Sequence, residues 1–296
     1  MITKAVIPIA GLGSRLLPAT KAIPKEMFPV VDKPMIQYVV EEAANAGIKE
    51  VVLVTHPSKN SVENHFDTMY ELESQLESRH KSDLLKEVQL IQELGVKIIS
   101  VRQSKAQGLG HAISCARPVI GDNDFCILLP DVLINPHLCN SKIDNIAAMI
   151  SRFEFEKSSQ IMLEPVPREK VHQYGIASVK EQEPIKSGNF SIIERLIEKP
   201  SPEDTPSNLA VVGRYVMSKS IWGFLEKLEP GVGGEIQLTD AIDALLATEK
   251  VEGYHIVGKS HDCGNHLNWL QTNIEFGLCS NKIGLSLKNW LKNLTF

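Results

Sequence analysis

The 296-residue sequence has no apolar run that approaches the ~20 residues needed to span a membrane as a helix. Its first residues, MITKAVIPIAGLGSRL, lack the long apolar segment and small-residue cleavage site of a signal peptide. Its five cysteines are an odd number with no CxxC pair, which disfavours a disulfide framework and a structural zinc site. We therefore expect a cytoplasmic protein that does not associate with a membrane.

An excess of positive charge is also missing. Lys and Arg total 31 and Asp and Glu total 36, so the formal net charge is −5. Because a general nucleic-acid binder gains its affinity by neutralising phosphates, we expect no nucleic-acid partner. A local basic pocket for a small phosphorylated ligand remains compatible with this balance.

Segments typical of strands and helices alternate over the first 135 residues. Buried apolar runs lie at 4–10, 50–55, 96–101 and 125–131, and helical patterns at 34–47, 59–93 and 109–116. This alternation predicts a parallel sheet with helices on both faces. Since ligands bind such sheets at the carboxyl ends of the strands, the candidate segments are 11–25, 101–110 and Asp131.

The second half of the chain is less regular. Strands are predicted at 159–166, 174–179, 191–199, 209–217 and 251–257, and helices at 219–228, 237–248 and in the tail, 264–296. No linker is long enough to separate independent domains, so we expect one mixed α/β unit, residues 1–296, with a helical tail. Trp269 and Trp290 could pack the tail on another subunit, and we expect a homo-oligomer, a dimer or a tetramer.

A glycine-rich loop follows the first predicted strand. Gly11-Leu12-Gly13 is not a dinucleotide-binding fingerprint, because Leu16 stands where the third glycine would be, and no GK[ST] follows as in a Walker A loop. Glycines let successive N–H groups point at a phosphate. Arg15, Lys21 and Lys25 add positive charge, which favours a phosphate site, although a surface loop with solvated lysines is the alternative.

The loop resembles the signature of the sugar-1-phosphate nucleotidylyltransferases, roughly GxG[ST]RxxPxTxxxPKxxxP. The match covers AGLGSRLLPATKAIPKEM (10–27) and VVDKPMIQY (30–38). Further matches run in order along the chain: VTHPSKNSVENHFD (54–67), GLGHAI (108–113), LLPDV (128–132), IEKP (197–200), SNLAVVGRYV (207–216), GEIQLTDAI (234–242) and KSHDCGN (259–265). So many spaced matches are far more specific than the loop alone.

The resemblance implies a fold and a reaction. The fold is a Rossmann-like α/β fold with a mixed, mostly parallel sheet, a nucleotide-binding half (1–135), a sugar-binding half (136–262) and a helical tail (263–296). The implied reaction is attack by glucose 1-phosphate on the α-phosphorus of UTP, which gives UDP-glucose and pyrophosphate. A phosphate dianion is already a nucleophile, so positioning and electrostatic stabilisation should provide most of the rate.

The resemblance also implies roles for individual residues. Arg15 would contact the triphosphate, Lys25 the phosphate region of the reacting complex, and Lys199 the sugar phosphate. The nucleotide-binding residues would be Ala10, Gly11, Gly13, Gln103 and Gly108, with Gln103 and Gly108 facing the uracil. The sugar-binding residues would be Tyr174, Gly175, Glu198 and Gly213. From local sequence alone, a surface glutamine, a solvated strand end and plain strand bulges are the alternatives.

Two aspartates are implied Mg²⁺ ligands. Asp131 ends a buried apolar strand, where a carboxylate is costly unless it is paired or bound to a metal, although an exposed turn or a helix cap is the alternative. Asp262 in SHDCGN has the same two interpretations. His261, Cys263 and His266 lie beside it, but their spacing fits no common four-ligand zinc site.

There are two alternatives to the reaction that the resemblance implies. Some close relatives resemble catalytically weak partners that modulate the active enzyme, and these replace the Ser/Thr-Arg pair of the loop. Ser14 and Arg15 are intact here, as are Lys25, Asp131 and Lys199. Thymidylyl transfer is the other alternative, because uracil and thymine differ by one methyl group, which a pocket distinguishes by only ~1–3 kcal/mol.

Overall fold

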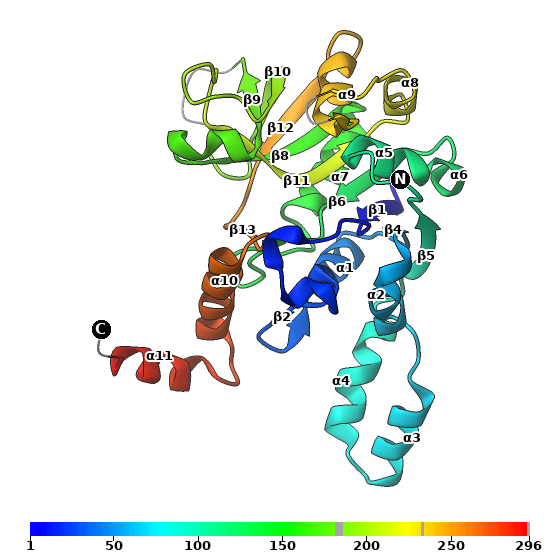
Figure 1. Ribbon diagram of the computed structural model, residues 1–296, viewed down its shortest axis with the longest axis vertical. Helices are drawn as coiled ribbons and strands as arrows, with labels where there is room; N and C mark the ends of the chain where they lie inside the picture. The colour runs from blue at the N-terminus through cyan, green and yellow to red at the C-terminus, as the bar shows by residue number, and fades with distance from the viewer. Residues whose placement is uncertain (181–185, 232–233, 295–296) are drawn as a thin grey trace.

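The computed structural model describes residues 1–180, 186–231 and 234–294. A nine-stranded sheet runs through these residues (Figure 1). From one edge to the other its strands are β5 (Lys97–Arg102), β4 (Glu50–Thr55), β1 (Lys4–Pro8), β6 (Phe125–Leu128), β11 (Leu209–Met217), β8 (Ser159–Pro165), β12 (Val251–His255), β10 (Phe190–Glu198) and β9 (Gly175–Val179).

The two halves of the sheet differ in strand direction. β5, β4, β1 and β6 pair in parallel, as the alternation of strands and helices predicts. β11 pairs with β6 in antiparallel orientation. Beyond β11, β8 and β12 are parallel, whereas β12 with β10 and β10 with β9 are antiparallel. The α/β fold with a mixed sheet is thus confirmed, and its parallel part is concentrated in the first half of the chain.

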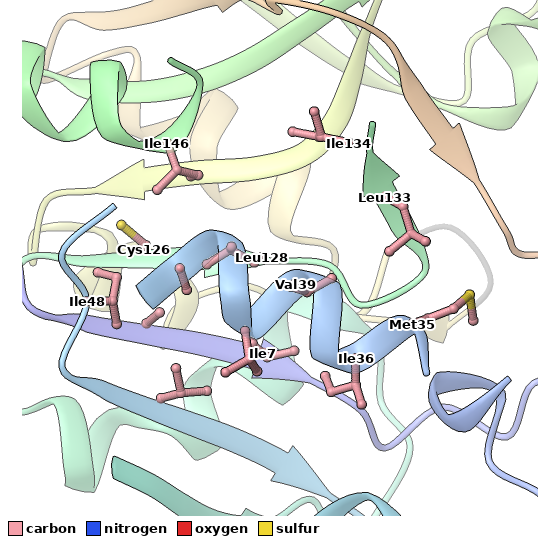
Figure 2. Close-up of a cluster of buried hydrophobic side chains, with 14 of the residues drawn as sticks. Ile7, Met35, Ile36, Val39, Ile48, Cys126, Leu128, Leu133, Ile134 and Ile146 are labelled. Carbon is pink, nitrogen blue, oxygen red and sulfur yellow. The ribbon is translucent and has the colours of Figure 1, made fainter. Parts of the chain in front are cut away.

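Helices cover both faces of the sheet, because the strands are apolar on both sides. Figure 2 shows Ile36 and Val39 of α1 lying over Ile7 and Leu128 of the sheet. α5, α8 and α9 pack on the opposite face. The helices are α1 (Met35–Asn45), α2 (Asn60–His65), α3 (Tyr70–Ser78), α4 (Ser82–Glu93), α5 (Leu109–Cys115), α6 (Arg117–Ile120), α7 (Ile146–Glu156), α8 (Ile221–Leu225), α9 (Leu238–Leu245), α10 (His266–Cys279) and α11 (Gly284–Lys292).

Short elements that the sequence pattern does not reveal complete the fold. β7 (Val132–Ile134) pairs with β13 (Ser260–Asp262), and β2 (Pro29–Val30) pairs with β3 (Lys33–Pro34). Strands of two or three residues are too short to show a periodicity. The α3–α4 hairpin extends away from the sheet (Figure 1), and neither helix contains a fully buried residue.

The tail is helical, as predicted, although its last two residues, 295–296, lie outside the described part of the chain. Trp269 packs edge-on against Phe28 and donates a hydrogen bond to the Pro29 carbonyl, so this tryptophan is held within the chain. Trp290 is exposed, and the expected packing of the tail on another subunit stays a prediction. Among the described residues, no helix is long and apolar enough to cross a membrane.

A cluster of ion pairs and hydrogen bonds surrounds the buried Glu252 on β12. Arg152 donates two hydrogen bonds to its carboxylate, at 2.8 and 3.0 Å, and Gln160 adds a third at 2.9 Å. Burial opposes ionisation, but the hydrogen bonds from Arg152, Gln160 and Lys250 lower the pKa of Glu252 to about 2.

This shift predicts a pH-dependent contribution to stability. The folded pKa lies below the ordinary value of 4.5, so the stabilisation is complete above that value and is lost as the pH falls toward 2. We expect Glu252→Gln to lower the free energy of unfolding at pH 7 by about 2–3 kcal/mol. Urea unfolding of both proteins should show this difference shrinking as the pH falls from 5 to 2. A difference that is independent of pH would contradict the prediction.

Candidate active site

A cavity of about 390 Å³ opens at the carboxyl ends of the parallel strands. This is the edge where α/β sheets bind ligands. Six residues singled out in the sequence line it: Ala10, Gly11, Lys25, Gln103, Gly108 and Asp131. Leu12, His56, Ser104, Leu109 and Glu235 also line it, and the sequence analysis assigned none of these a role.

The glycine-rich loop folds back on itself beside this cavity. Gly13 has a positive φ of 68°, and its carbonyl accepts hydrogen bonds from the Leu16 amide and the Thr20 hydroxyl. Three 3-10 turns follow, at Ser14–Leu16, Ala19–Lys21 and Lys25–Met27. These turns return the chain to the strand ends, so Lys25 lies close to Asp131 although 106 positions separate them.

Lys25 and Asp131 form a largely buried ion pair. Lys25 Nζ lies 2.6 Å from Asp131 Oδ2, and each side chain is about 15% exposed. Burial disfavours both charges, but the carboxylates of Asp131 and Glu26 outweigh it and raise the pKa of Lys25. Likewise, Lys25 offsets burial and lowers the pKa of Asp131. Both groups are therefore charged at neutral pH.

Asp262 is brought to Asp131 by backbone pairing. β13 places Asp262 opposite Val132 on β7, and the Cys263 amide donates a 2.8 Å hydrogen bond to the Asp131 carbonyl. Burial, and then repulsion by Asp131, raises the pKa of Asp262, although the Gly264 amide donates a hydrogen bond to its side chain.

Arg15 lies near Asp262, on the other side of Gly264. A β-carbon at Gly264 would be 2.5 Å from Arg15 Nη2 and 2.8 Å from Asp262 Oδ1, so Gly264 leaves the space that the guanidinium fills. The positive charge of Arg15 also acts on Asp131 and Lys25. The structure thus brings together two cations and two carboxylates that are far apart in the sequence.

The two aspartates fit a divalent cation that is shared with a phosphorylated ligand. The described residues contain no group of three or more His, Cys, Asp or Glu that could hold a metal ion. However, Mg²⁺ usually binds through one or two carboxylates together with substrate phosphates and water. Asp131 and Asp262 offer two carboxylates whose mutual repulsion a divalent cation would relieve.

Gln103 and Gly108 lie together at another side of the cavity. Gln103 is buried and donates from Nε2 to the Gly108 carbonyl, at 3.3 Å, and its amide lies 2.9 Å from His111 Nδ1. Gly108 has φ 97° and ψ 175°, a conformation that is essentially restricted to glycine. A β-carbon there would be 2.6 Å from the Ile236 carbonyl, so the segment around Ile236 closes tightly over the Gly108 turn.

Three of the four predicted sugar-binding residues lie on β9, β10 and the loops beside them, whereas Gly213 lies on β11. Glu198 pairs with Gly175 across the two strands and accepts a 2.7 Å hydrogen bond from Thr239, which sequence reasoning missed. The Lys199 amide donates to the Tyr174 carbonyl, and Lys199 Nζ lies 2.9 Å from Glu198 Oε1. These contacts place Tyr174, Gly175, Glu198 and Lys199 in one cluster.

Tyr174 connects this cluster with Asp262, and Gly213 adjoins a residue that lines the first cavity. Tyr174 and Asp262 both line a second cavity of about 290 Å³, and burial together with the charge of Asp262 raises the pKa of Tyr174. Gly213, with φ 71°, leaves room for the Leu129 side chain, which lines the first cavity. The Leu129 amide also donates a 2.9 Å hydrogen bond to the Gly213 carbonyl.

A buried ion pair beneath the loop was also missed by sequence reasoning. Lys59 Nζ lies 2.8 Å from Glu26 Oε2, and both side chains are almost fully buried. No local pattern distinguishes these two residues from exposed charges. Their only signal is position, since each lies within a segment that matches the family pattern.

Comparison with known proteins agrees with this geometry. The nucleotidyl transferase family model matches residues 4–276. The chain belongs to the nucleotidyl transferase family. A UTP–glucose-1-phosphate uridylyltransferase of Haemophilus influenzae is 54% identical to this nucleotidyl transferase, over 98% of each chain.

Two solved structures are similar over nearly the whole chain. The UTP-bound UGPase from Acinetobacter baumannii has a TM-score of 0.91 and 47% identity, with 100% of both chains covered. A UDP-glucose pyrophosphorylase complexed with UDP-glucose has a TM-score of 0.83 and 38% identity, covering 93% of this chain and 98% of the other.

The Gly108 turn gives a test of the cavity wall. We expect Gly108→Ala to lower the free energy of unfolding by roughly 2–5 kcal/mol, through backbone strain and the clash with Ile236. Gly95→Ala is the matched control, because Gly95 also has a positive φ but no atom within 4 Å of its β-carbon position. It should cost only about 1–2 kcal/mol. Urea unfolding measures both, and equal losses would contradict the assigned contact.

Proposed function

We propose that this nucleotidyl transferase makes UDP-glucose and pyrophosphate from UTP and α-D-glucose 1-phosphate. The observation that carries this proposal is the meeting of Arg15, Lys25 and the two aspartates between the nucleotide-side and sugar-side cavities. The 54% identity to a UTP–glucose-1-phosphate uridylyltransferase over nearly the full chain supports the choice of substrates.

The reaction brings two anions together, so the residues act mainly by charge and position. An oxygen of the sugar phosphate attacks the α-phosphorus of UTP in line, and pyrophosphate leaves. We assign Arg15 to the triphosphate, where its planar guanidinium donates to phosphate oxygens, and Lys25 to the reacting phosphates as a mobile point charge. Lys199, whose side chain is 54% exposed, would reach the sugar phosphate.

Asp131 and Asp262 would hold the magnesium ion. When bound, it would neutralise charge on the phosphates and orient them for attack. The ion pair with Lys25 keeps Asp131 ionised before the substrates bind. Arg15, next to Asp262, offsets part of the repulsion between the two carboxylates.

Specificity is assigned to the two ends of the site. Ala10, Gly11 and Gly13 would bring backbone N–H groups to the nucleotide, with Gln103 and Gly108 at the uracil edge. Glu198 would accept hydrogen bonds from glucose hydroxyls. The remaining sugar contacts are assigned to Tyr174, Gly175 and Gly213.

The continuous sheet supports one domain over 1–296, and we also propose a cytoplasmic homo-oligomer.

Release of pyrophosphate tests the proposed reaction directly. We expect release with UTP, glucose 1-phosphate and Mg²⁺ together, and none when either substrate is omitted. dTTP should support a reaction roughly 10- to 200-fold weaker, because one methyl group separates the bases. Failure to release pyrophosphate above a no-enzyme control would favour the catalytically weak relative, and faster reaction with dTTP would favour thymidylyl transfer.

Replacement of Lys199 tests its assignment to the sugar phosphate. We expect Lys199→Ala to reduce kcat/KM for glucose 1-phosphate by about 100- to 1000-fold, with little change in melting temperature, because the exposed side chain contributes little to folding. Lys97→Ala is the control, since Lys97 is exposed at the opposite end of a strand that leads to the cavity. Near-normal turnover by Lys199→Ala would remove Lys199 from the site.

A further inference from the structure

Arg214 is fully buried in the middle of the fold, one residue after Gly213 on β11. All five of its N–H donors have acceptors. Nε and Nη2 donate to the carboxylate of Glu42 at 2.8–3.1 Å. Nη1 donates to the carbonyls of Leu129, at 3.1 Å, and Gly213, at 3.2 Å, and Nη2 also donates to the Val132 carbonyl, at 2.8 Å.

The three carbonyls are not scattered. Leu129 and Val132 lie on either side of Asp131, and Gly213 lies on the strand that joins the two halves of the sheet. The guanidinium therefore fixes the backbone both before and after Asp131. Asp131 lies in the short connection between β6 and β7. Its segment is therefore not held by the continuous hydrogen bonding of a strand.

Glu42 fixes the guanidinium in turn. It lies on α1, which packs on the sheet, and its side chain is only 12% exposed. Two parallel hydrogen bonds from one guanidinium to one carboxylate set the orientation as well as the distance. A lysine could not replace this arrangement, because it offers three donors from a single atom.

We propose that Arg214 and Glu42 form a positioning pair that holds Asp131 in place for the metal-bound nucleotide. Neither residue touches the proposed substrates or the metal. Their effect is exerted through the backbone of the Leu129–Val132 segment. The alternative is a purely structural ion pair, which well-packed apolar residues can often replace. Disruption of a positioning pair would weaken the metal-dependent binding of the nucleotide, whereas disruption of a purely structural ion pair would only lower stability.

The test is calorimetric binding of UTP to the full chain, once in EDTA and once in excess Mg²⁺. The ratio of the two dissociation constants measures the contribution of the metal. We expect Arg214→Lys to reduce this ratio about 10- to 100-fold, as residues that orient a metal ligand typically do. The dissociation constant in EDTA should change by less than about threefold, because the other nucleotide contacts remain.

Arg152→Lys is the matched control, since Arg152 also makes a two-pronged contact with a buried glutamate, Glu252. It should lower the melting temperature and leave the ratio unchanged. If Arg214→Lys fails to fold, Glu42→Gln provides the same test, because it weakens the contact that orients the guanidinium.

Each outcome decides the proposal. An unchanged ratio in Arg214→Lys, which means that affinity for UTP falls equally in EDTA and in Mg²⁺ or does not fall, would overturn the proposal. A change of the ratio in Arg152→Lys would also overturn it. The proposal rests on the proposed nucleotidyl transfer. Wild-type protein that binds no UTP under either condition would contradict that function, whereas a wild-type ratio of one would remove the basis of the positioning pair alone.

Discussion

The ion pair between Lys25 and Asp131 is the interaction on which the site depends. A carboxylate at the end of a buried strand is costly, and the lysine offsets that cost. The pair also places a cation and an anion at the point where phosphates and a metal ion would bind. On the proposed function, a substrate phosphate would bind Lys25 and a divalent cation would bind Asp131.

The fold supplies this pair with its neighbours through backbone pairing. β13 pairs with β7 and brings Asp262 to Asp131, and the turns of the glycine-rich loop return Lys25 to the sheet. Backbone hydrogen bonds hold these segments together. The repulsion between the two carboxylates therefore does not have to be overcome by contacts between the charged side chains. The charges can therefore be arranged for the chemistry of two anions.

The sequence predicted the parts with strong local patterns. The parallel half of the sheet, the helix beginning after Pro34 and the glycine-rich loop each have a clear periodicity or composition. The β7–β13 pair and α7 were missed. β7 and β13 are too short to show a pattern, and their partners lie more than 120 residues apart.

The site could be predicted only in part for the same reason. The family resemblance pointed to Lys25 and Asp131, but no local pattern showed that they touch. Arg214 lies in a segment that matches the family pattern, but no local pattern showed that it is buried against carbonyls of another segment. Long-range contacts of this kind are set by the tertiary structure and not by local sequence.

The most direct measurement of the central claim is a crystal structure of the protein with UTP and Mg²⁺. The account predicts the ion bound to Asp131 and Asp262, with the triphosphate contacted by Arg15 and Lys25. A triphosphate bound away from the Lys25–Asp131 pair, or a metal ion that ignores both aspartates, would contradict it.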